Sequence, residues 1–137
     1  MTAPNLRSLT YVSRPTAPMS ELEFTQLGLE AGRLNALDGI TGLLAFNGER
    51  FCQTVEGSRE AIDNLLDRLS NDSRHDGLQI LADTSIDQRS FRSWDMQLLT
   101  VPDDCRSALA VASSRLDSQV DLAARTKIYD TVEGLFA

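Results

Sequence analysis

The sequence predicts an α+β fold with the element order β-α-β-β-α-β, followed by a fifth strand and two C-terminal helices that cover the sheet. Strand-like and helix-like apolar patterns succeed each other in this order. An Asn47-Gly48 dipeptide, the strongest short signal for a hairpin, separates the second strand from the third. No repeat, low-complexity tract or long linker divides the 137 residues, so we expect a single core.

The first strand and first helix have clear boundaries in the sequence. The strand is predicted over Leu6 to Ser13, because the stretch from Pro15 to Pro18 cannot continue a hydrogen-bonded ladder. Ser20 with Glu23 three residues later forms a capping box, which marks a helix start. Apolar residues then recur at helical spacing, at Phe24, Leu27, Ala31 and Leu34.

The middle of the chain predicts a hairpin and a second helix. After an Asp38-Gly39 turn, Ile40 to Phe46 is apolar on both faces, which is typical of a central strand covered on both sides. Asn47-Gly48 joins it to the next strand, Arg50 to Glu56. Gly57-Ser58 closes that strand and caps a helix with the apolar stripe Ile62, Leu65, Leu66 and Leu69.

The remaining elements complete a split βαβ, or ferredoxin-like, arrangement, which many unrelated functions share. Asp76-Gly77 predicts a turn into a fourth strand, Leu78 to Ala82, and Trp94 to Thr100 predicts a fifth. Beyond Pro102, two amphipathic segments predict helices that cover the otherwise bare face of the sheet. These segments are Cys105–Leu116 and Gln119–Leu135.

The composition excludes several classes of function. With 20 acidic and 13 basic residues the formal net charge is −7, which argues against non-specific binding to nucleic acid or anionic lipid. Cys52 and Cys105 are far apart and the chain has one histidine, so we expect no metal site and a reducing compartment. Met1 to Asn5 lacks the features of a signal peptide, and no apolar run approaches the roughly 20 residues of a membrane helix. We therefore expect a cytoplasmic protein.

Two polar side chains fall on faces that should be buried. In the third strand Gln53 alternates with Phe51 and Val55, and in the first strand Tyr11 shares a face with Leu9. An unpaired buried amide costs about 1–3 kcal/mol, so Gln53 must have partners. Either Tyr11 and Gln53 bond to each other or to backbone, or they serve a ligand.

The first helix carries small residues beside its apolar stripe. Gly28, Ala31 and Gly32 predict either close packing of the helix or a trough for a flat ligand between the two helices. Asn35 ends the same helix, and we interpret it either as a C-cap in the left-handed region or as a ligand contact.

Polar residues also prolong the inward face of the second helix. Arg68 and Asp72 follow Leu65 at helical spacing, and Arg74 and His75 come directly after. These side chains either meet the polar tail of a ligand or form a solvated helix end.

One further set of motifs occurs in order along the chain. They are Tyr11-Val12-Ser13, Asn35, Gly39-Ile40-Thr41-Gly42-Leu43-Leu44, Phe51-Cys52-Gln53-Thr54-Val55-Glu56-Gly57, Asp72-Ser73-Arg74-His75, Arg89, Phe91, Trp94 and Met96. In this order and spacing they resemble the BLUF domains, flavin-binding sensors of blue light, from about Leu6 to Leu99. Leu34 departs from the pattern, because some members carry a polar residue there that touches the flavin, and this leaves the number of polar contacts open.

The resemblance implies a flavin, FAD or alternatively FMN, between the two helices. Tyr11, Gln53 and Asn35 would reach its ring, and Arg68, Asp72, Arg74 and His75 are candidates for its carbonyl edge or its ribityl and phosphate end. Excitation would draw an electron and a proton from Tyr11 through Gln53 and leave the Gln53 amide rotated or tautomerised. An amide suits this role because it carries a donor and an acceptor that can be exchanged.

The resemblance also implies how such a change would leave the site. Output would pass through the fifth strand, where Trp94 and Met96 exchange places, although both could simply pack in the core. We expect residues 1–101 to form the flavin-binding domain and residues 102–137 a helical extension of it. An unidentified downstream protein and a homodimer or larger homo-oligomer are the expected partners.

Two other functions fit the same fold. An acylphosphatase-like enzyme would need an early arginine within an anion cradle of backbone amides, but Arg14 stands before Pro15 without a glycine-rich loop. A plain interaction domain would use the polar core only structurally. We expect a sensor rather than an enzyme, with no catalytic domain following it.

Overall fold

The computed structural model describes residues 5–91, 96–115 and 122–137. Along the chain they form five strands and four helices, which agrees with the predicted order. The elements are β1 (Leu6–Pro15), α1 (Glu21–Leu37), β2 (Thr41–Phe46), β3 (Phe51–Ser58), α2 (Arg59–Ser70), β4 (His75–Ile86), β5 (Gln97–Thr100), α3 (Cys105–Ser114) and α4 (Leu122–Gly134).

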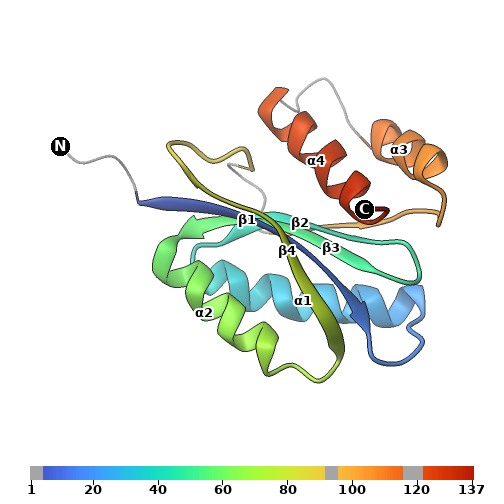
Figure 1. Ribbon diagram of the computed structural model, residues 1–137, viewed down its shortest axis with the longest axis horizontal. Coiled ribbons are helices and arrows are strands. Elements are labelled where there is room, and N and C mark those ends of the chain that lie inside the picture. Colours follow the sequence, from blue (N-terminus) through green and yellow to red (C-terminus); the bar gives the residue numbers. More distant parts are fainter. Residues whose placement is uncertain (1–4, 92–95, 116–121) are drawn as a thin grey trace.

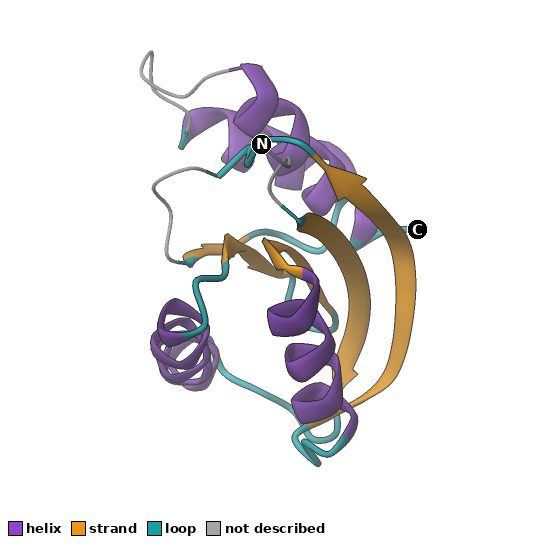
Figure 2. Cartoon of the chain, turned by 90° about the vertical axis from the view of Figure 1, so that its left-hand side faces the viewer, coloured by secondary structure: helices purple, strands orange, loops and turns teal. Residues whose placement is uncertain are grey.

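The strands form one sheet in the order β4-β1-β3-β2-β5. Neighbouring strands are antiparallel except β5, which runs parallel to β2. Helices α1 and α2 cover one face of the sheet, and α3 and α4 cover the other (Figures 1 and 2). The ferredoxin-like class with an appended strand and two covering helices is therefore confirmed.

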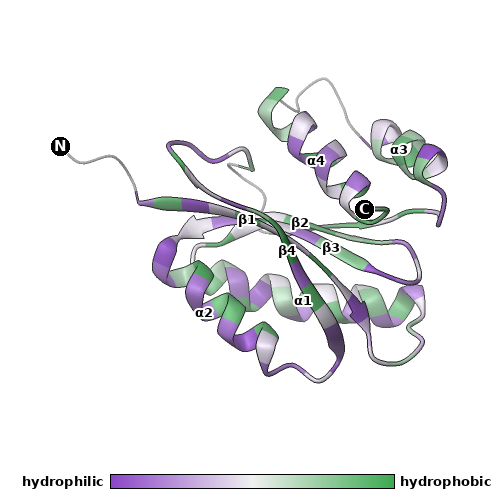
Figure 3. Ribbon diagram, in the orientation of Figure 1, coloured by the Kyte–Doolittle hydropathy of each residue, from purple (hydrophilic) through white to green (hydrophobic). Residues whose placement is uncertain are grey.

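Strand β3 is the centre of the molecule, because helices pack on both of its faces. On the face covered by α1 and α2, Phe51 stacks with Phe24 of α1 and Phe46 of β2. The ring centroids of Phe46 and Phe51 are 5.1 Å apart. On the face covered by α3 and α4, Cys52 packs in a cluster with Ile128 of α4. Hydrophobic and hydrophilic patches share α2, as expected of a helix that buries one side (Figure 3).

The predicted caps and hairpin are confirmed. The Ser20 hydroxyl accepts from the Glu23 amide, and the Glu23 carboxylate accepts from the Ser20 amide, so the capping box is complete. Ser58 caps α2 in the same way through the Ala61 amide. Gly48 takes a φ of 92° in the turn between β2 and β3, where a residue with a side chain would be strained.

The prediction of a turn at Asp76-Gly77 was wrong. Both residues lie inside β4, which begins at His75 and extends to Ile86. The β1–β4 register shifts between Val12 and Arg14, so β4 holds one extra residue at this point. Gly77, with a φ of 63°, supplies the positive φ that such a bulge needs, which is why the dipeptide looked like a turn.

The fifth strand begins later than predicted. It starts at Gln97, directly after Met96, and the earlier part of the predicted strand, including Trp94, lies outside the residues that the structure describes. Short β5 adds to the edge of the sheet next to β2.

A buried carboxylate anchors the segment before β5. Glu56 of β3 is fully buried, and its two oxygens accept from the backbone amides of Ser90 at 2.9 Å and Phe91 at 2.7 Å. Arg89 donates to the backbone oxygens of Glu56 at 2.8 Å and Gly39 at 2.7 Å. These bonds hold residues 89–91 against the ends of β2 and β3.

A chain of hydroxyl groups crosses from the sheet to α4. Thr131 donates to the backbone oxygen of Lys127 at 2.6 Å, so its single proton is committed. Thr54 of β3 must then donate to Thr131 at 2.6 Å, and Thr10 of β1 to Thr54 at 2.9 Å. The chain therefore has one direction, from β1 through β3 into α4.

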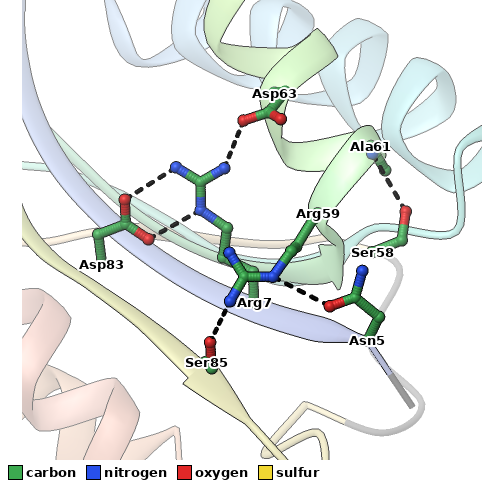
Figure 4. Close-up of polar contacts among 8 residues, drawn as sticks. All are labelled: Asn5, Arg7, Ser58, Arg59, Ala61, Asp63, Asp83 and Ser85. Atoms are coloured by element: carbon green, nitrogen blue, oxygen red, sulfur yellow. Dashed lines mark hydrogen bonds and ion pairs between the residues drawn. The ribbon is translucent and has the colours of Figure 1, made fainter.

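An ion-pair network fixes the start of α2 to the other edge of the sheet. Arg7 of β1 contacts Asp83 of β4 at 2.8 Å and also Asp63 of α2 (Figure 4). Arg59 reaches Ser85 of β4 and Asn5. The hydrogen bond from Arg7 is the main reason that the pKa of Asp83 lies below its usual value. The described pairs are partly exposed, so each contributes little to stability by itself.

We expect Glu56→Gln to lower the free energy of unfolding by about 1–3 kcal/mol, because an amide nitrogen would face a backbone N–H that loses its acceptor. Urea denaturation followed by circular dichroism measures this difference. Glu49→Gln, in the exposed turn between β2 and β3, is the control and should leave stability within about 0.5 kcal/mol. Equal stability of the two variants would contradict the anchoring role of Glu56.

Candidate functional site

The pairing of β1 with β3 places Tyr11 directly opposite Gln53. Both side chains are buried on the face covered by α1 and α2, with exposures of 4% and 3%. The Tyr11 hydroxyl donates to Gln53 Oε1, as one of the sequence interpretations proposed. This bond leaves Gln53 Nε2 with the sulfur of Met96 at 3.4 Å, which is a weak acceptor.

Tyr11 is a neutral hydrogen-bond donor in this environment. Burial is the main cause that holds the pKa of its phenol well above the usual value, because the phenolate would lose its solvation. Cys52 and Asp72 raise this pKa further. The proton therefore stays on Tyr11 at physiological pH and is shared only with Gln53.

Asn35 occupies the last full turn of α1 and is 1% exposed. The alternative that it is a left-handed C-cap was wrong, because α1 continues to Leu37 and Asp38 is the C-cap. Its Oδ1 accepts from Arg68 Nη2 at 2.8 Å. Its Nδ2 is buried and has no partner among the described residues. Such an orphaned donor is costly and points to a missing acceptor.

These side chains share a pocket between α1, α2 and the sheet. Its empty space, the open mouth included, is about 490 Å³. Both apolar and polar side chains line it. It is lined by Tyr11, Ser13, Leu27, Ala31, Asn35, Leu44, Phe51, Gln53, Leu65, Leu69, Asp72, Arg74 and His75.

Arg68 is the one predicted contact that does not line this pocket. It borders an adjoining groove that also includes Asn35, Asp72 and Arg74. There its guanidinium bonds to Asn35 and forms an ion pair with Asp38 at 2.8 Å. Sequence reasoning missed Asp38 as a neighbour of the site, because nothing in a turn dipeptide shows that its carboxylate faces another helix.

Asp72 and Arg74, between α2 and β4, and His75, the first residue of β4, also line the pocket. Arg74 binds the Asp72 carboxylate at 2.7 Å and Glu30 of α1 at 3.2 Å. The hydrogen bond from Arg74 is the main cause of the lowered pKa of Asp72. His75 differs, because both of its ring nitrogens are buried without a partner among the described residues. The alternative of a solvated helix end therefore does not describe the His75 ring, whereas the Arg74 side chain is exposed.

The interpretation of Gly28 and Gly32 as a trough for a ligand was wrong. A Cβ at Gly28 would lie 2.4 Å from a methyl carbon of Leu98 in β5, and one at Gly32 would lie 3.2 Å from Met96. The glycines therefore allow close packing of α1 against the start of β5, which was the other alternative. Ala31 is the small residue of this helix that faces the pocket.

Met96 links the packing of α1 to the Gln53 amide, because it packs against Gly32 and its sulfur accepts a hydrogen bond from Gln53. Trp94, the other expected output residue, lies outside the described residues, so its relation to the pocket stays a prediction.

The polar groups of the pocket share one chemical property. Among the described residues, Asn35 Nδ2 has no acceptor, and Gln53 Nε2 has only the thioether of Met96. Both amides stand next to a neutral phenol and apolar walls. A flat, uncharged ring with a carbonyl or an unprotonated nitrogen at its edge would supply the acceptors that these amides need. In the described parts of the chain no group of three potential metal ligands occurs, and no helix is long and apolar enough to span a membrane.

Comparison with known proteins gives a consistent set of similarities. The family model BLUF, described as sensors of blue-light using FAD, matches residues 6–97. Photoactivated adenylate cyclase subunit beta of Euglena gracilis is 34% identical over 124 residues, and its counterpart in Euglena longa is 33% identical. Each match covers 84% of this chain but 14% of the relative, so the chain corresponds to a small part of those proteins.

Solved structures show the same similarity over nearly the whole chain. BlrB, a BLUF protein in its dark state, is 30% identical with a TM-score of 0.70, covering 96% of this chain and 97% of that one. The BLUF structure of BlrP1 is 26% identical with a TM-score of 0.71, covering 98% and 93%. A bacterial light-regulated adenylyl cyclase, at 23% identity and a TM-score of 0.68, shares the fold over 40% of its chain and 95% of this one.

The raised pKa of Tyr11 predicts a pH dependence of stability. The phenol ionises near pH 10 in the unfolded chain and at a higher pH in the folded one, so its contribution is complete below about pH 10. Above that pH the free energy of unfolding should fall by about 1.4 kcal/mol per pH unit for this group. Burial also raises the pKa of Cys52 to about 12, which adds a second slope of the same sign.

Tyr11→Phe isolates the contribution of the phenol. Urea denaturation at several pH values above 10 should give a smaller decline for Tyr11→Phe than for the wild type. Tyr129→Phe changes the only other tyrosine of the chain and is the control. If Tyr11→Phe and the wild type declined in parallel, the phenol would ionise at its ordinary pKa.

Proposed function

The chain belongs to the BLUF family of flavin-binding blue-light sensors, and from this premise we propose that the pocket between α1 and α2 holds the flavin ring and that Tyr11 and Gln53 form its switch. One observation carries this proposal. A buried phenol and two buried carboxamides converge on one pocket, and the two amide nitrogens lack a strong acceptor. The flavin edge, with its carbonyl groups and ring nitrogens, is such an acceptor.

The residues present fit a flavin. Asn35 Nδ2 and Gln53 Nε2 would donate to the ring edge, while Leu65 and Phe51 provide apolar contacts for its faces. Asp72, Arg74 and His75 line the pocket and would meet the ribityl and phosphate end, where the His75 nitrogens, unpartnered in the described structure, are available. We infer FAD as the flavin, because the matching family is described as using FAD, and FMN is the alternative.

Bound flavin would supply absorption of blue light and, once excited, an acceptor for one electron. Tyr11 is suited to release that electron together with its phenolic proton, because burial disfavours loss of the proton alone. The proton lies on a hydrogen bond to Gln53 Oε1. Exchange of donor and acceptor within the Gln53 amide would break its contact with Met96 and rewire two hydrogen bonds without large motion.

The effect of this exchange would reach the surface through β5 and the tail. Met96 directly precedes β5, and we propose the same output role for Trp94. Residues 1–101 would form the flavin-binding domain and residues 102–137 its helical extension, since α4 packs on β3 through Ile128 and Cys52. An unidentified downstream protein, and a second copy or larger assembly of this chain, are the proposed recipients.

We infer that this chain senses rather than catalyses. In the relatives named photoactivated adenylate cyclase, the matched region is 14% of the protein. The acylphosphatase-like alternative lacks support, because Arg14 lies within β1, paired in register with Asp76, and not in an anion-binding loop. We propose a cytoplasmic location, for which the absence of a membrane-spanning helix in the described residues is the only structural support.

The proposal predicts a coloured and light-responsive protein. Purified protein should be yellow, and blue light should shift its flavin absorption to longer wavelength in a reversible way. Tyr11→Phe should stay yellow and lose the shift, because the variant has no phenolic proton to release. Tyr129→Phe should keep both properties. A colourless wild type, or a full shift in Tyr11→Phe, would contradict the proposed function.

Gln53→Ala tests the second partner of the switch. It should retain flavin, because Asn35 and the apolar walls remain, and the light-induced shift should disappear. Absorption spectra in the dark and under blue light measure this. A shift equal to that of the wild type would show that the amide is not the group that rearranges.

A further inference from the structure

The pocket contains two carboxamides with the same arrangement but different partners. In each, a strong donor occupies the amide oxygen, and the nitrogen has no strong acceptor among the described residues. Tyr11 O–H donates to Gln53 Oε1, and Arg68 Nη2 donates to Asn35 Oδ1 at 2.8 Å. Asn35 Nδ2 has no partner in the described structure, and Gln53 Nε2 has the Met96 sulfur.

The two donors, Tyr11 and Arg68, differ in whether they can also accept a hydrogen bond. A tyrosine hydroxyl can donate or accept, so the Gln53 amide can present either its oxygen or its nitrogen to Tyr11. A guanidinium carries only donors and stays protonated. If Asn35 exchanged its oxygen and nitrogen, an N–H would face the N–H of Arg68 at hydrogen-bond distance. Tautomerisation would weaken the same contact, because it would replace the amide oxygen by a hydroxyl oxygen, which is a poorer acceptor for Arg68.

Arg68 is itself held in place. Its other terminal nitrogen forms an ion pair with Asp38 at 2.8 Å, and Asp38 is the C-cap residue of the same helix that carries Asn35. The backbone of Asn35 is fixed too, since its carbonyl oxygen accepts from the amides of Asp38 and Ile40. The guanidinium thus bridges α2 to the end of α1.

We propose that Arg68, supported by Asp38, is a positioning residue that locks the Asn35 amide with its nitrogen toward the ligand. This proposal rests on the proposed function of the pocket. The lock makes Asn35 a permanent donor, so the site selects a ligand with an acceptor at that point. It also confines the light-driven exchange to Gln53, because only the amide bonded to a hydroxyl is free to change.

Three substitutions at Arg68 separate the lock from simple loss of charge. Arg68→Lys keeps a group with donors only, Arg68→Gln offers both a donor and an acceptor, and Arg68→Met offers no donor and only a weak acceptor. Arg33→Gln, at an exposed arginine of α1 outside the pocket lining, is the matched control. Asp38→Ala removes the support and leaves Arg68 itself unchanged.

Nuclear magnetic resonance of ¹⁵N-labelled side-chain amides reads the lock directly, with the Asn35 signal assigned from its absence in Asn35→Leu. Wild type, Arg68→Lys and Arg33→Gln should show one set of Asn35 resonances in the dark and under blue light. Arg68→Gln should show two sets, and Asp38→Ala should broaden the signal. A single set in Arg68→Gln, or a light-induced exchange of Asn35 in the wild type, would overturn the proposal.

Flavin affinity provides the second measurement, by titration of the apoprotein with FAD and with FMN. Arg68→Gln and Arg68→Met should raise the dissociation constant about tenfold, and Arg68→Lys should raise it less. In light-minus-dark infrared spectra, bands of isotope-labelled asparagine should appear in Arg68→Gln alone. Unchanged affinity in Arg68→Met would overturn the lock even while the wild type stays yellow and light-responsive, whereas failure of the proposed function would show as a colourless wild type.

Discussion

The antiparallel pairing of β1 with β3 is the constraint on which the other features depend. Its register sets Tyr11 opposite Gln53 and, one residue earlier on β1, Thr10 opposite Thr54. Because side chains alternate between faces, the first pair enters the pocket and the second joins the hydroxyl chain that ends in α4. A slip of one residue would exchange these faces and separate the phenol from its amide. The position of the pocket therefore follows from the backbone ladder of the two central strands.

A polar core of this kind is stable because almost every group has a partner. Glu56 is satisfied by two backbone amides, and Thr131 by the hydroxyl chain. The exceptions among the described side chains include Asn35 and His75, and both line the same pocket. Unpaired buried donors normally cost stability, so their concentration at one place is a stronger indication of a ligand than any one of them.

The sequence predicted the element order, the caps and the inward direction of Tyr11 and Gln53, because alternation and capping are local properties of the chain. It failed where a residue's role is set by a distant partner. Gly77 was mistaken for a turn because bulges and turns need the same positive φ. The sequence left Gly28 open between close packing and a ligand trough, because spacing on a helix cannot show that Leu98 fills the space. The contact of Arg68 with Asn35 joins two helices, and no local pattern contains it.

The complete burial of β3 has a consequence for anything that responds to this molecule. Every residue of the strand from Phe51 to Gly57 is buried, so a binding partner cannot contact the backbone that carries Gln53. A rearrangement of the Gln53 amide can therefore affect another protein only through the elements that pack against β3. Another protein could bind the outer surfaces of α4 and α1 or the sheet edges at β5 and β4. Substitutions on these surfaces can thus change the binding partner without changing the residues of the pocket.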